Sequence, residues 1–349
     1  MAGQTLHAFL RSGGFAGHAH AGAIAGVIMG LAAKAVEVRK LTKQGALIRG
    51  FAASRGETNA GGDTQKDLDV IADGMFLEAA RNEAIALYGS EENNFPILLD
   101  PDKPLALAID PLDGSSNIET NVSIGTIFSI LPVQGDPRVA PETSFLQSGR
   151  NQLAAGFFIY GPQLALALTV GSGTRIFVHS PKLGDFVEAY DAVSIPGKTG
   201  EFAINASNYR HWEDPVRLWV DDCLAGTDGP RERDFNMRWI ASLVAETYRI
   251  LVRGGVFLYP GDRRKGYSAG RLRLVYESNP IALLVEQAGG KATDTVNRIL
   301  DLVPVTLHQR TPLVFGSGDE VERIARYHVD PAMISDRSPL FGKRGLFRV

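Results

Sequence analysis

Short apolar runs bounded by glycine or proline turns dominate the first half of the chain after residue 100. Runs of this length between turn residues are typical of buried strands. They predict strands at residues 105–109, 122–131, 153–160, 164–170 and 175–178. Together these strands would build one large sheet.

Apolar residues at helical spacing predict helices before this sheet. Leu68, Ile71 and Met75 belong to an amphipathic pattern over about 67–88, whose acidic first turn includes Asp69. Residues 19–38 predict a second, N-terminal amphipathic helix. Between the two, residues 50–66 are rich in Gly, Ser, Asn and Thr, which predicts a long mobile loop carrying Asp63. Loops of this length in a compact domain often act as lids.

The second half of the chain alternates between strand and helix patterns. Strands are predicted at 202–204, 256–259 and 272–276, and helices at 216–224, 240–251 and 281–288. Such alternation favours a layered α/β architecture. A chain of 349 residues suits two domains of ordinary size. The turn residues around Pro196 and Gly197 divide it into an N-terminal domain, 1–196, and a C-terminal domain, 197–349.

Composition and charge narrow the class of protein. Hydrophobic residues make up 44% and charged residues 21%, enough for a real core. A net charge of −3 provides no basic field for nucleic acid or an anionic membrane. The single cysteine, Cys223, excludes an intrachain disulfide and a cysteine-based zinc site. Residues 19–38 are too short and too polar to span a bilayer. We therefore expect a cytoplasmic protein without nucleic-acid or membrane partners.

The strongest candidate chemistry follows the predicted strand 105–109. Asp110 stands where this strand ends, Asp113 follows one turn later, and Gly114, Ser115 and Ser116 offer backbone N–H groups. Two carboxylates facing a divalent metal, with N–H donors beside them, suit phosphate-ester chemistry. A plain Pro-x-Asp-Gly turn between two elements is the alternative interpretation.

Further acids extend this set. Glu277 follows the predicted strand 272–276, and Glu91 and Glu92 precede the central strand. Adjacent glutamates are also common as solvated surface charge. Taken together, the acids form an oxygen-only ligand set, which favours Mg²⁺ or Mn²⁺ over zinc or copper. The second half adds cations and a phenol that could hold a remote phosphate: Arg238, Tyr259, Arg263, Arg264, Lys265 and Arg271. A solvated basic loop is the alternative for residues 263–265.

Several longer motifs carry a family resemblance. The segments 110–117, 122–128, 62–69 and 272–280 resemble class I fructose-1,6-bisphosphatase, as do Gly149-Arg-Asn, residues 254–260 and residues 286–290. They occur in family order from about residue 40 to residue 320. The short Asp-Pro-Leu-Asp-Gly-Ser core alone is shared with inositol monophosphatase relatives, whereas the longer matches are specific to the bisphosphatase.

The resemblance implies a layered α-β-α-β-α sugar phosphatase fold of two α/β halves, assembled as a homotetramer. It implies Mg²⁺-dependent hydrolysis of the 1-phosphate of fructose 1,6-bisphosphate, in gluconeogenesis or the Calvin cycle, with Mn²⁺ as a substitute metal. Glu91, Asp110, Asp113, Glu277 and the Leu112 carbonyl would be metal ligands.

The remaining roles are implied in the same way. Asp69 and Glu92 would together take a proton from the attacking water, with Asp63 helping once its loop closes. Asp113, Gly114, Ser115 and Ser116 would hold the 1-phosphate. The sugar and its 6-phosphate would be held by Asn205, Arg238, Tyr259 and Arg271, with Arg238 reaching in from a neighbouring subunit.

The chain departs from the family pattern at several positions. Pro104, Leu105 and Pro132 stand where animal enzymes carry AMP-binding side chains, so AMP inhibition of that kind is not expected. A lone cysteine excludes the redox loop of the chloroplast enzymes. In the sugar-phosphate pocket, Trp239 and Asn208 replace family tyrosines, which leaves room for sedoheptulose 1,7-bisphosphate as a substrate. A non-catalytic sugar-phosphate sensor is a third interpretation, against which the intact acids argue.

Overall fold

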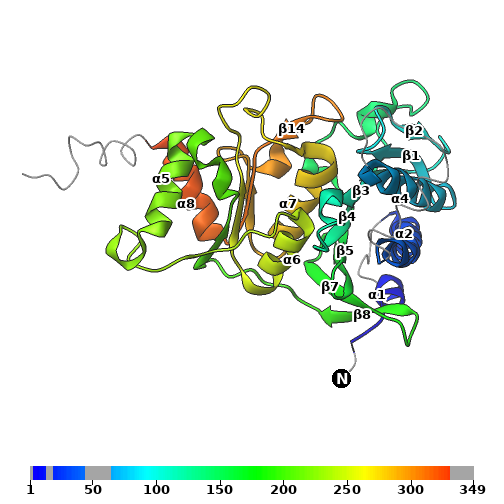
Figure 1. The fold of residues 1–349 in the computed structure, drawn as a ribbon. Helices are drawn as coiled ribbons and strands as arrows, with labels where there is room; N and C mark the ends of the chain where they lie inside the picture. Colours follow the sequence, from blue (N-terminus) through cyan, green and yellow to red (C-terminus); the bar gives the residue numbers. More distant parts are fainter. Residues whose placement is uncertain (1–2, 13–18, 44–63, 331–349) are drawn as a thin grey trace, which may run out of the picture.

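The computed structural model describes residues 3–12, 19–43 and 64–330 of the chain. In these residues, the two larger β-sheets alternate with three layers of helices across the molecule (Figure 1). The α-β-α-β-α layering expected from the sequence is therefore confirmed. Asp63 and most of the predicted 50–66 loop lie outside the described residues.

The first sheet has eight strands in the order β2-β1-β3-β4-β5-β6-β7-β8. Their bounds are β1 (Ile85–Ser90), β2 (Ile97–Leu98), β3 (Leu105–Asp113), β4 (Ile124–Pro132), β5 (Ala154–Tyr160), β6 (Leu164–Thr169), β7 (Thr174–Ser180) and β8 (Asp185–Tyr190). β1 and β3 run parallel, and every other pair is antiparallel. β3 is buried along its whole length, as a central strand covered on both faces should be.

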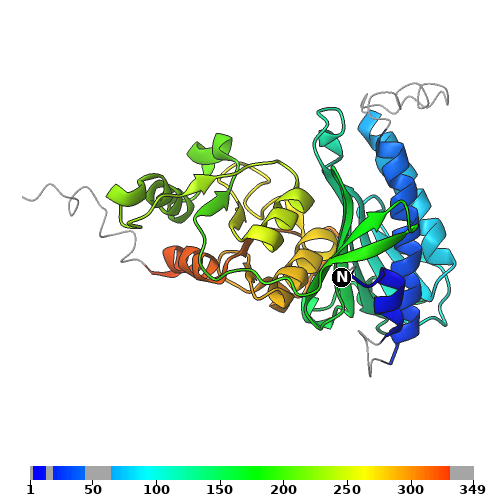
Figure 2. The same cartoon turned by 90° about the horizontal axis from the view of Figure 1, so that it is seen from below.

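Helices from both halves cover this sheet. One face carries α1 (Leu6–Arg11), α2 (Ala21–Thr42) and α4 (Thr64–Arg81), and Figure 2 shows α2 running along it. The opposite face packs against α6 (Leu243–Arg253) and α7 (Asn279–Gln287), which belong to the second half. The middle helical layer thereby joins the two halves through one apolar core.

The second sheet has five strands in the order β10-β9-β11-β15-β13. Their bounds are β9 (Glu201–Ala203), β10 (Asn236–Met237), β11 (Val256–Tyr259), β13 (Lys291–Thr293) and β15 (Leu313–Gly316). The outer layer is α5 (Asp214–Leu224) and α8 (Gly318–Val329). Along β11, Phe257 faces the middle layer, whereas Val256 and Leu258 face the outer one. This is the period-2 alternation of a strand between two cores. β12 (Leu272–Arg273) and β14 (Arg310–Thr311) form a separate pair.

Residues 19–38 are expected to be too short and too polar to span a bilayer, but helix α2 is long and apolar enough to do so by length and composition alone. In this structure its apolar residues pack into the core beneath the first sheet; the buried ones are Ile24, Val27, Ile28, Leu31, Ala32, Ala35 and Val38. In this structure α2 is therefore a helix that packs against the core of the first sheet.

Three predicted elements differ from the structure. The strand expected over 105–109, with Asp110 at its end and a turn after it, continues as β3 through Asp110 to Asp113. The helix expected over 67–88 ends at Arg81, and the apolar residues after it form strand β1. The strand expected over 272–276 is only two residues long, because the chain turns at Leu274 into a π-helical turn, η8 (Leu274–Ser278). Glu277 therefore sits inside a helical turn and not at the end of a strand. The two sheets lie on either side of residue 196, and the domain division there stays a prediction.

Candidate active site

Strand β3 delivers two acids to one end of the first sheet. Asp110 and Asp113 are both buried, and the pairing of β3 with β4 becomes irregular between them. The Leu112 N–H donates to Asp110 Oδ1 at 3.1 Å, and Thr126 Oγ1 donates to the Pro111 carbonyl at 2.8 Å. These bonds hold the irregular stretch of β3 that separates the two carboxylates. The Val244 N–H, in the first turn of α6, donates to Asp113 Oδ2 at 3.1 Å.

The parallel pairing of β1 with β3 places Glu91 at the same end of the first sheet as Asp110. Ser90 at the end of β1 is paired with Ile109, and the Glu91 N–H donates to the Ile109 carbonyl at 3.0 Å. Because the carboxyl ends of parallel strands share one sheet edge, Glu91 lies beside Asp110.

Glu277 comes from the other half. Its Oε2 accepts from the Arg273 N–H at 2.6 Å, which fixes its carboxylate within the η8 turn. Glu91, Asp110 and Glu277 then offer three carboxylate oxygens within 4.8 Å of one another. The structure thus brings together three of the four predicted acidic ligands in one group. Asp113 is not in that group but lies close enough to act on two of its members through its charge.

The acids repel one another inside the protein. Burial raises the pKa of Asp110 well above its ordinary value, and the charges of Asp113 and Glu277 raise it further. Burial followed by the charge of Asp113 raises the pKa of Glu277 to about 8, and burial raises that of Asp113 to about 6. Carboxylates this close are stabilised in their ionised form by a shared cation.

A pH dependence of stability follows for the metal-free protein. Between about pH 8 and the ordinary glutamate range, folded Glu277 binds a proton that the unfolded chain lacks. Lowering the pH through this window in EDTA should therefore raise the urea midpoint of unfolding. The Glu277→Gln variant, measured at the same pH values, should show a shallower rise. An equal slope in both proteins would contradict the assignment.

Arg273 is a functional candidate that the sequence argument missed. Its guanidinium forms an ion pair with Glu91 Oε1, whereas Glu91 Oε2 is buried with no hydrogen-bond partner among the described residues. One oxygen of Glu91 is thus held, and the other remains free to bind a cation. In the sequence, Arg273 is distinguished only by its position four residues before Glu277, within the motif at residues 272–280.

Asp69 lies on α4, near Glu92. Burial, and after it the negative charge of Glu92, raise the pKa of Asp69 to about 7. Asp69 Oδ1 is buried and has no hydrogen-bond partner among the described residues. The Glu92 N–H donates to Ser90 Oγ at 3.2 Å, which anchors the backbone after β1. The two acids predicted to work together are therefore electrostatic neighbours.

The Gly-Ser-Ser segment forms a tight turn directly after Asp113. Gly114 has φ of 75°, in the left-handed region that favours glycine, and Ser115–Asn117 form a short 3₁₀ helix, η3. Asn117 Nδ2 donates to the Ala241 carbonyl at 2.6 Å, which ties the turn to the second half. The first N–H groups of such a turn have no partner within it.

The sugar-phosphate residues separate into two places. Asn205, Tyr259 and Arg271 line one pocket, together with Asn208 and Asp262. Arg238 is not among its lining residues: its side chain is 50% exposed and lies 3.7 Å from Glu201. The structure of a single chain therefore brings three of the four predicted residues together. The guanidinium carbons of Arg264 and Arg271 each lie 4.7 Å from the ring centroid of Tyr267.

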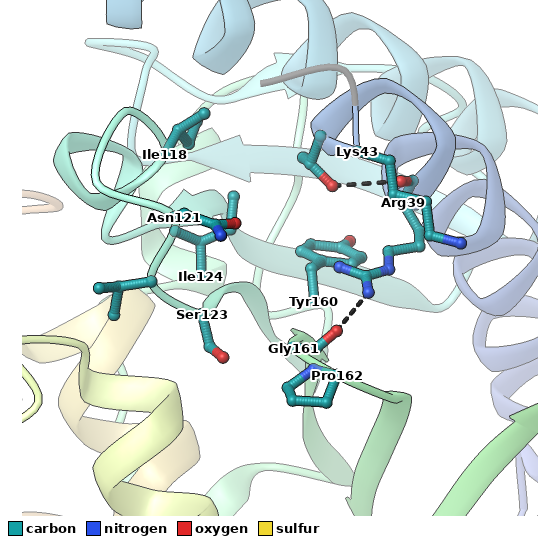
Figure 3. Close-up of a pocket in the computed structure, with 11 residues that line it drawn as sticks. Arg39, Lys43, Ile118, Asn121, Ser123, Ile124, Tyr160, Gly161 and Pro162 are labelled. Carbon is teal, nitrogen blue, oxygen red and sulfur yellow. Dashed lines mark hydrogen bonds between the residues drawn. The ribbon is translucent and has the colours of Figure 1, made fainter. Parts of the chain in front are cut away.

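A larger cavity, of about 390 Å³, lies away from these groups, between the C-terminal end of α2 and the ends of β4 and β5 (Figure 3). Arg39 and Lys43 line it, but the Arg39 guanidinium donates to the Gly161 carbonyl. The cavity shares no lining residue with the acids. We assign it no part in the chemistry.

Nearly the whole chain matches family models and known proteins of one family. Residues 14–191 match the family model for the fructose-1-6-bisphosphatase N-terminal domain, and residues 195–329 match that for the C-terminal domain. The fructose-1,6-bisphosphatase class 1 of Rhizobium meliloti (strain 1021) is 64% identical over 348 residues and is covered in full, as is this chain. That of Rhodopseudomonas palustris (strain HaA2) is 52% identical, with 99% of each chain covered.

A solved structure extends the agreement to three dimensions. The holo form of Leishmania major fructose-1,6-bisphosphatase superposes with a TM-score of 0.82 at 30% identity, covering 93% of this chain and 99% of that one. Family models, relatives and fold all point the same way: the chain belongs to the class 1 fructose-1,6-bisphosphatase family.

Proposed function

We propose that the protein hydrolyses the 1-phosphate of fructose 1,6-bisphosphate to give fructose 6-phosphate and inorganic phosphate, with Mg²⁺ as its metal. The observation that carries this proposal is the group of three carboxylates from both halves, beside a turn rich in N–H groups. Family membership supports the substrate.

The metal would be held by Glu91, Asp110, Asp113 and Glu277, with the Leu112 carbonyl as a further ligand. The fit is supported by Glu91 Oε2, which has no hydrogen-bond partner in the described part of the chain, and by the raised pKa values of the buried acids. All donors are oxygen, which suits Mg²⁺ and allows Mn²⁺. When bound, such a metal cancels phosphate charge and lowers the pKa of a water molecule.

The protein's own groups do the rest of the chemistry. Glu92 and Asp69 would take the proton of the attacking water, and the raised pKa of Asp69 suits a base that works near neutral pH. The Ser115 and Ser116 N–H groups, beside Asp113 and Gly114, would hold the phosphate that leaves. Asp63 would assist from its loop; its position lies outside the described residues.

The remote 6-phosphate would bind in the pocket formed by Asn205, Tyr259 and Arg271. Arg271 is a forked cation suited to a phosphate dianion. The exposed side chain of Arg238 supports a role in a neighbouring subunit, so we propose a homotetramer in which this residue completes another chain's pocket. A single buried, unpaired cysteine supports a cytoplasmic location.

Arg271→Ala should weaken substrate binding without stopping the chemistry. A lost charge-assisted contact to a phosphate costs about 1.5–3 kcal/mol, so the KM for fructose 1,6-bisphosphate should rise by about 10–150-fold. Its kcat should change little, because the pocket shares no lining residue with the acid group. Steady-state kinetics test this. Arg263→Ala, on an exposed arginine paired with Asp214, is the matched control and should leave KM unchanged.

Sedoheptulose 1,7-bisphosphate is the alternative substrate. It is favoured by the polar Asn208, which accepts a hydrogen bond from Arg264 at 3.1 Å at the edge of the sugar-phosphate pocket. Phosphate release from both bisphosphates, at equal concentrations with Mg²⁺, separates the two functions. A kcat/KM larger for fructose 1,6-bisphosphate supports our proposal. A larger value for the seven-carbon sugar would replace it.

A further inference from the structure

A hydrogen-bonded cluster of three residues, two of them buried, has no role in the chemistry described so far. Asp73, on α4, is 9% exposed, and Tyr88, on β1, is fully buried. Tyr88 Oη donates to Asp73 Oδ1 at 2.7 Å. Asn93 Nδ2 donates to Asp73 Oδ2 at 3.0 Å. Both oxygens of one buried carboxylate are therefore engaged by donors from two other segments.

These three residues lie next to Asp69 and Glu92, the two proposed catalytic bases. Asp73 follows Asp69 by one helical turn, so the two project from the same face of α4. Asn93 directly follows Glu92, and its own N–H donates to the Ser90 carbonyl at 3.2 Å. The cluster thus forms a direct connection between the helix that carries Asp69 and the turn that carries Glu92.

The same cluster reaches the second half. His308 Nε2 lies 3.0 Å from the Asn93 carbonyl oxygen. Because a carbonyl can only accept, this nitrogen must carry the proton. The His308 ring lies 5.5 Å, centroid to centroid, from that of Tyr276, the neighbour of Glu277. The segments bearing Asp69, Glu92 and Glu277 are therefore linked by one set of contacts.

We propose that Asp73 is a positioning residue for the reaction, which sets the separation between Asp69 and Glu92. This inference rests on the function proposed above. A buried carboxylate that accepts from two donors fixes both of them, and leaving either donor unpaired carries a desolvation penalty. Because reacting groups must sit within a fraction of an ångström of their productive geometry, a shift of this turn acts on turnover before it acts on substrate binding.

Asp73→Asn tests the proposal directly. The new amide is neutral and has one accepting oxygen, so it keeps only one of the two hydrogen bonds that the carboxylate accepts, and in a weaker, uncharged form. It presents an NH₂ group to the other partner, and the Tyr88 hydroxyl can accept from that group only by giving up its own donation to this side chain. We expect kcat to fall by about 10–100-fold, the cost of disturbing an outer-shell or positioning contact. The KM for fructose 1,6-bisphosphate should change little, because Asn205, Tyr259 and Arg271 lie in a separate pocket.

A double variant distinguishes geometry from simple damage. In Asp73→Asn combined with Asn93→Asp, the donor and the acceptor of one hydrogen bond exchange places, and the amide oxygen stays available to Tyr88. Much of the lost kcat should return. Asp222→Asn is the matched control: Asp222 is a buried aspartate that accepts from the Tyr327 hydroxyl in the outer layer of the second half. It should lower the urea midpoint while leaving kcat close to wild type.

The outcomes separate this inference from the function on which it rests. A wild-type protein that releases no phosphate from fructose 1,6-bisphosphate contradicts the proposed function. With an active wild type, the positioning role is overturned by a near-normal kcat in folded Asp73→Asn. It is also overturned by a KM that rises as much as kcat falls, or by a double variant that folds yet recovers no turnover.

Discussion

Glu92→Gln is expected to lower phosphate release from fructose 1,6-bisphosphate by about 10²–10⁴-fold, the range that general bases contribute. The amide keeps the size of the side chain but cannot accept a proton from water. Glu92 also acts on its partner, since its charge contributes to raising the pKa of Asp69 to about 7. Without that charge, Asp69 becomes a weaker base. Steady-state assays with saturating Mg²⁺ measure the loss.

Folding and substrate binding should survive this change. The urea midpoint of Glu92→Gln and its KM should stay near those of the wild type. Glu37→Gln, on α2, removes a 50% exposed glutamate that pairs with Lys34 and is not part of the acid group, so it should leave turnover unchanged. Near-normal turnover in Glu92→Gln would refute the role of this residue as base.

The second large effect concerns the metal ligands. Asp110→Asn should lower turnover by more than about 100-fold, because losing even an outer-shell partner of a metal ligand costs about 10–100-fold. The negative charges of Asp113, Glu277 and Asp69 all raise the pKa of Asp110. Replacing Asp110 removes a proposed metal ligand and also removes a source of repulsion among the acids. Activity and stability should therefore change in opposite directions.

Urea unfolding in EDTA and in MgCl₂ measures the stability part. In EDTA, Asp110→Asn should unfold at a higher urea concentration than the wild type, because fewer like charges are buried together. Adding Mg²⁺ should stabilise the wild type by binding its folded state and should have little effect on the variant. Asp102→Asn, with an 81% exposed side chain, is the control and should follow the wild type. A full Mg²⁺ shift in Asp110→Asn would remove it from the ligand set.

Much of the fold was predictable from apolar runs. Strands β3 to β7 lie within a few residues of the predicted runs, and β3 to β6 are buried along almost their whole length, as strands covered on both faces are. β1 was missed because the preceding helix pattern continued into it without a break. β8 (Asp185–Tyr190) was missed because it is only partly buried and its charged residues, Asp185 and Glu188, interrupt the apolar run.

The candidate site was predictable where one short segment holds the chemistry. Asp110, Asp113 and the turn after them stand together in the sequence, and the fold keeps them together. The position of Glu91 depends on the parallel pairing of β1 with β3, and that of Glu277 on a π-helical turn. Neither follows from periodicity. Arg273 and Asp73 are single polar residues inside regular elements, where only their buried partners reveal a role.

Phosphate release from fructose 1,6-bisphosphate by EDTA-treated protein, titrated with Mg²⁺, tests the central claim most directly. Because the carboxylates of Glu91, Asp110 and Glu277 form the proposed metal site, we expect no phosphate release before metal is added. We expect phosphate release to recover with Mg²⁺ and fructose 6-phosphate to be the only sugar product. Release that persists in EDTA, or a product that keeps the 1-phosphate, would contradict this account.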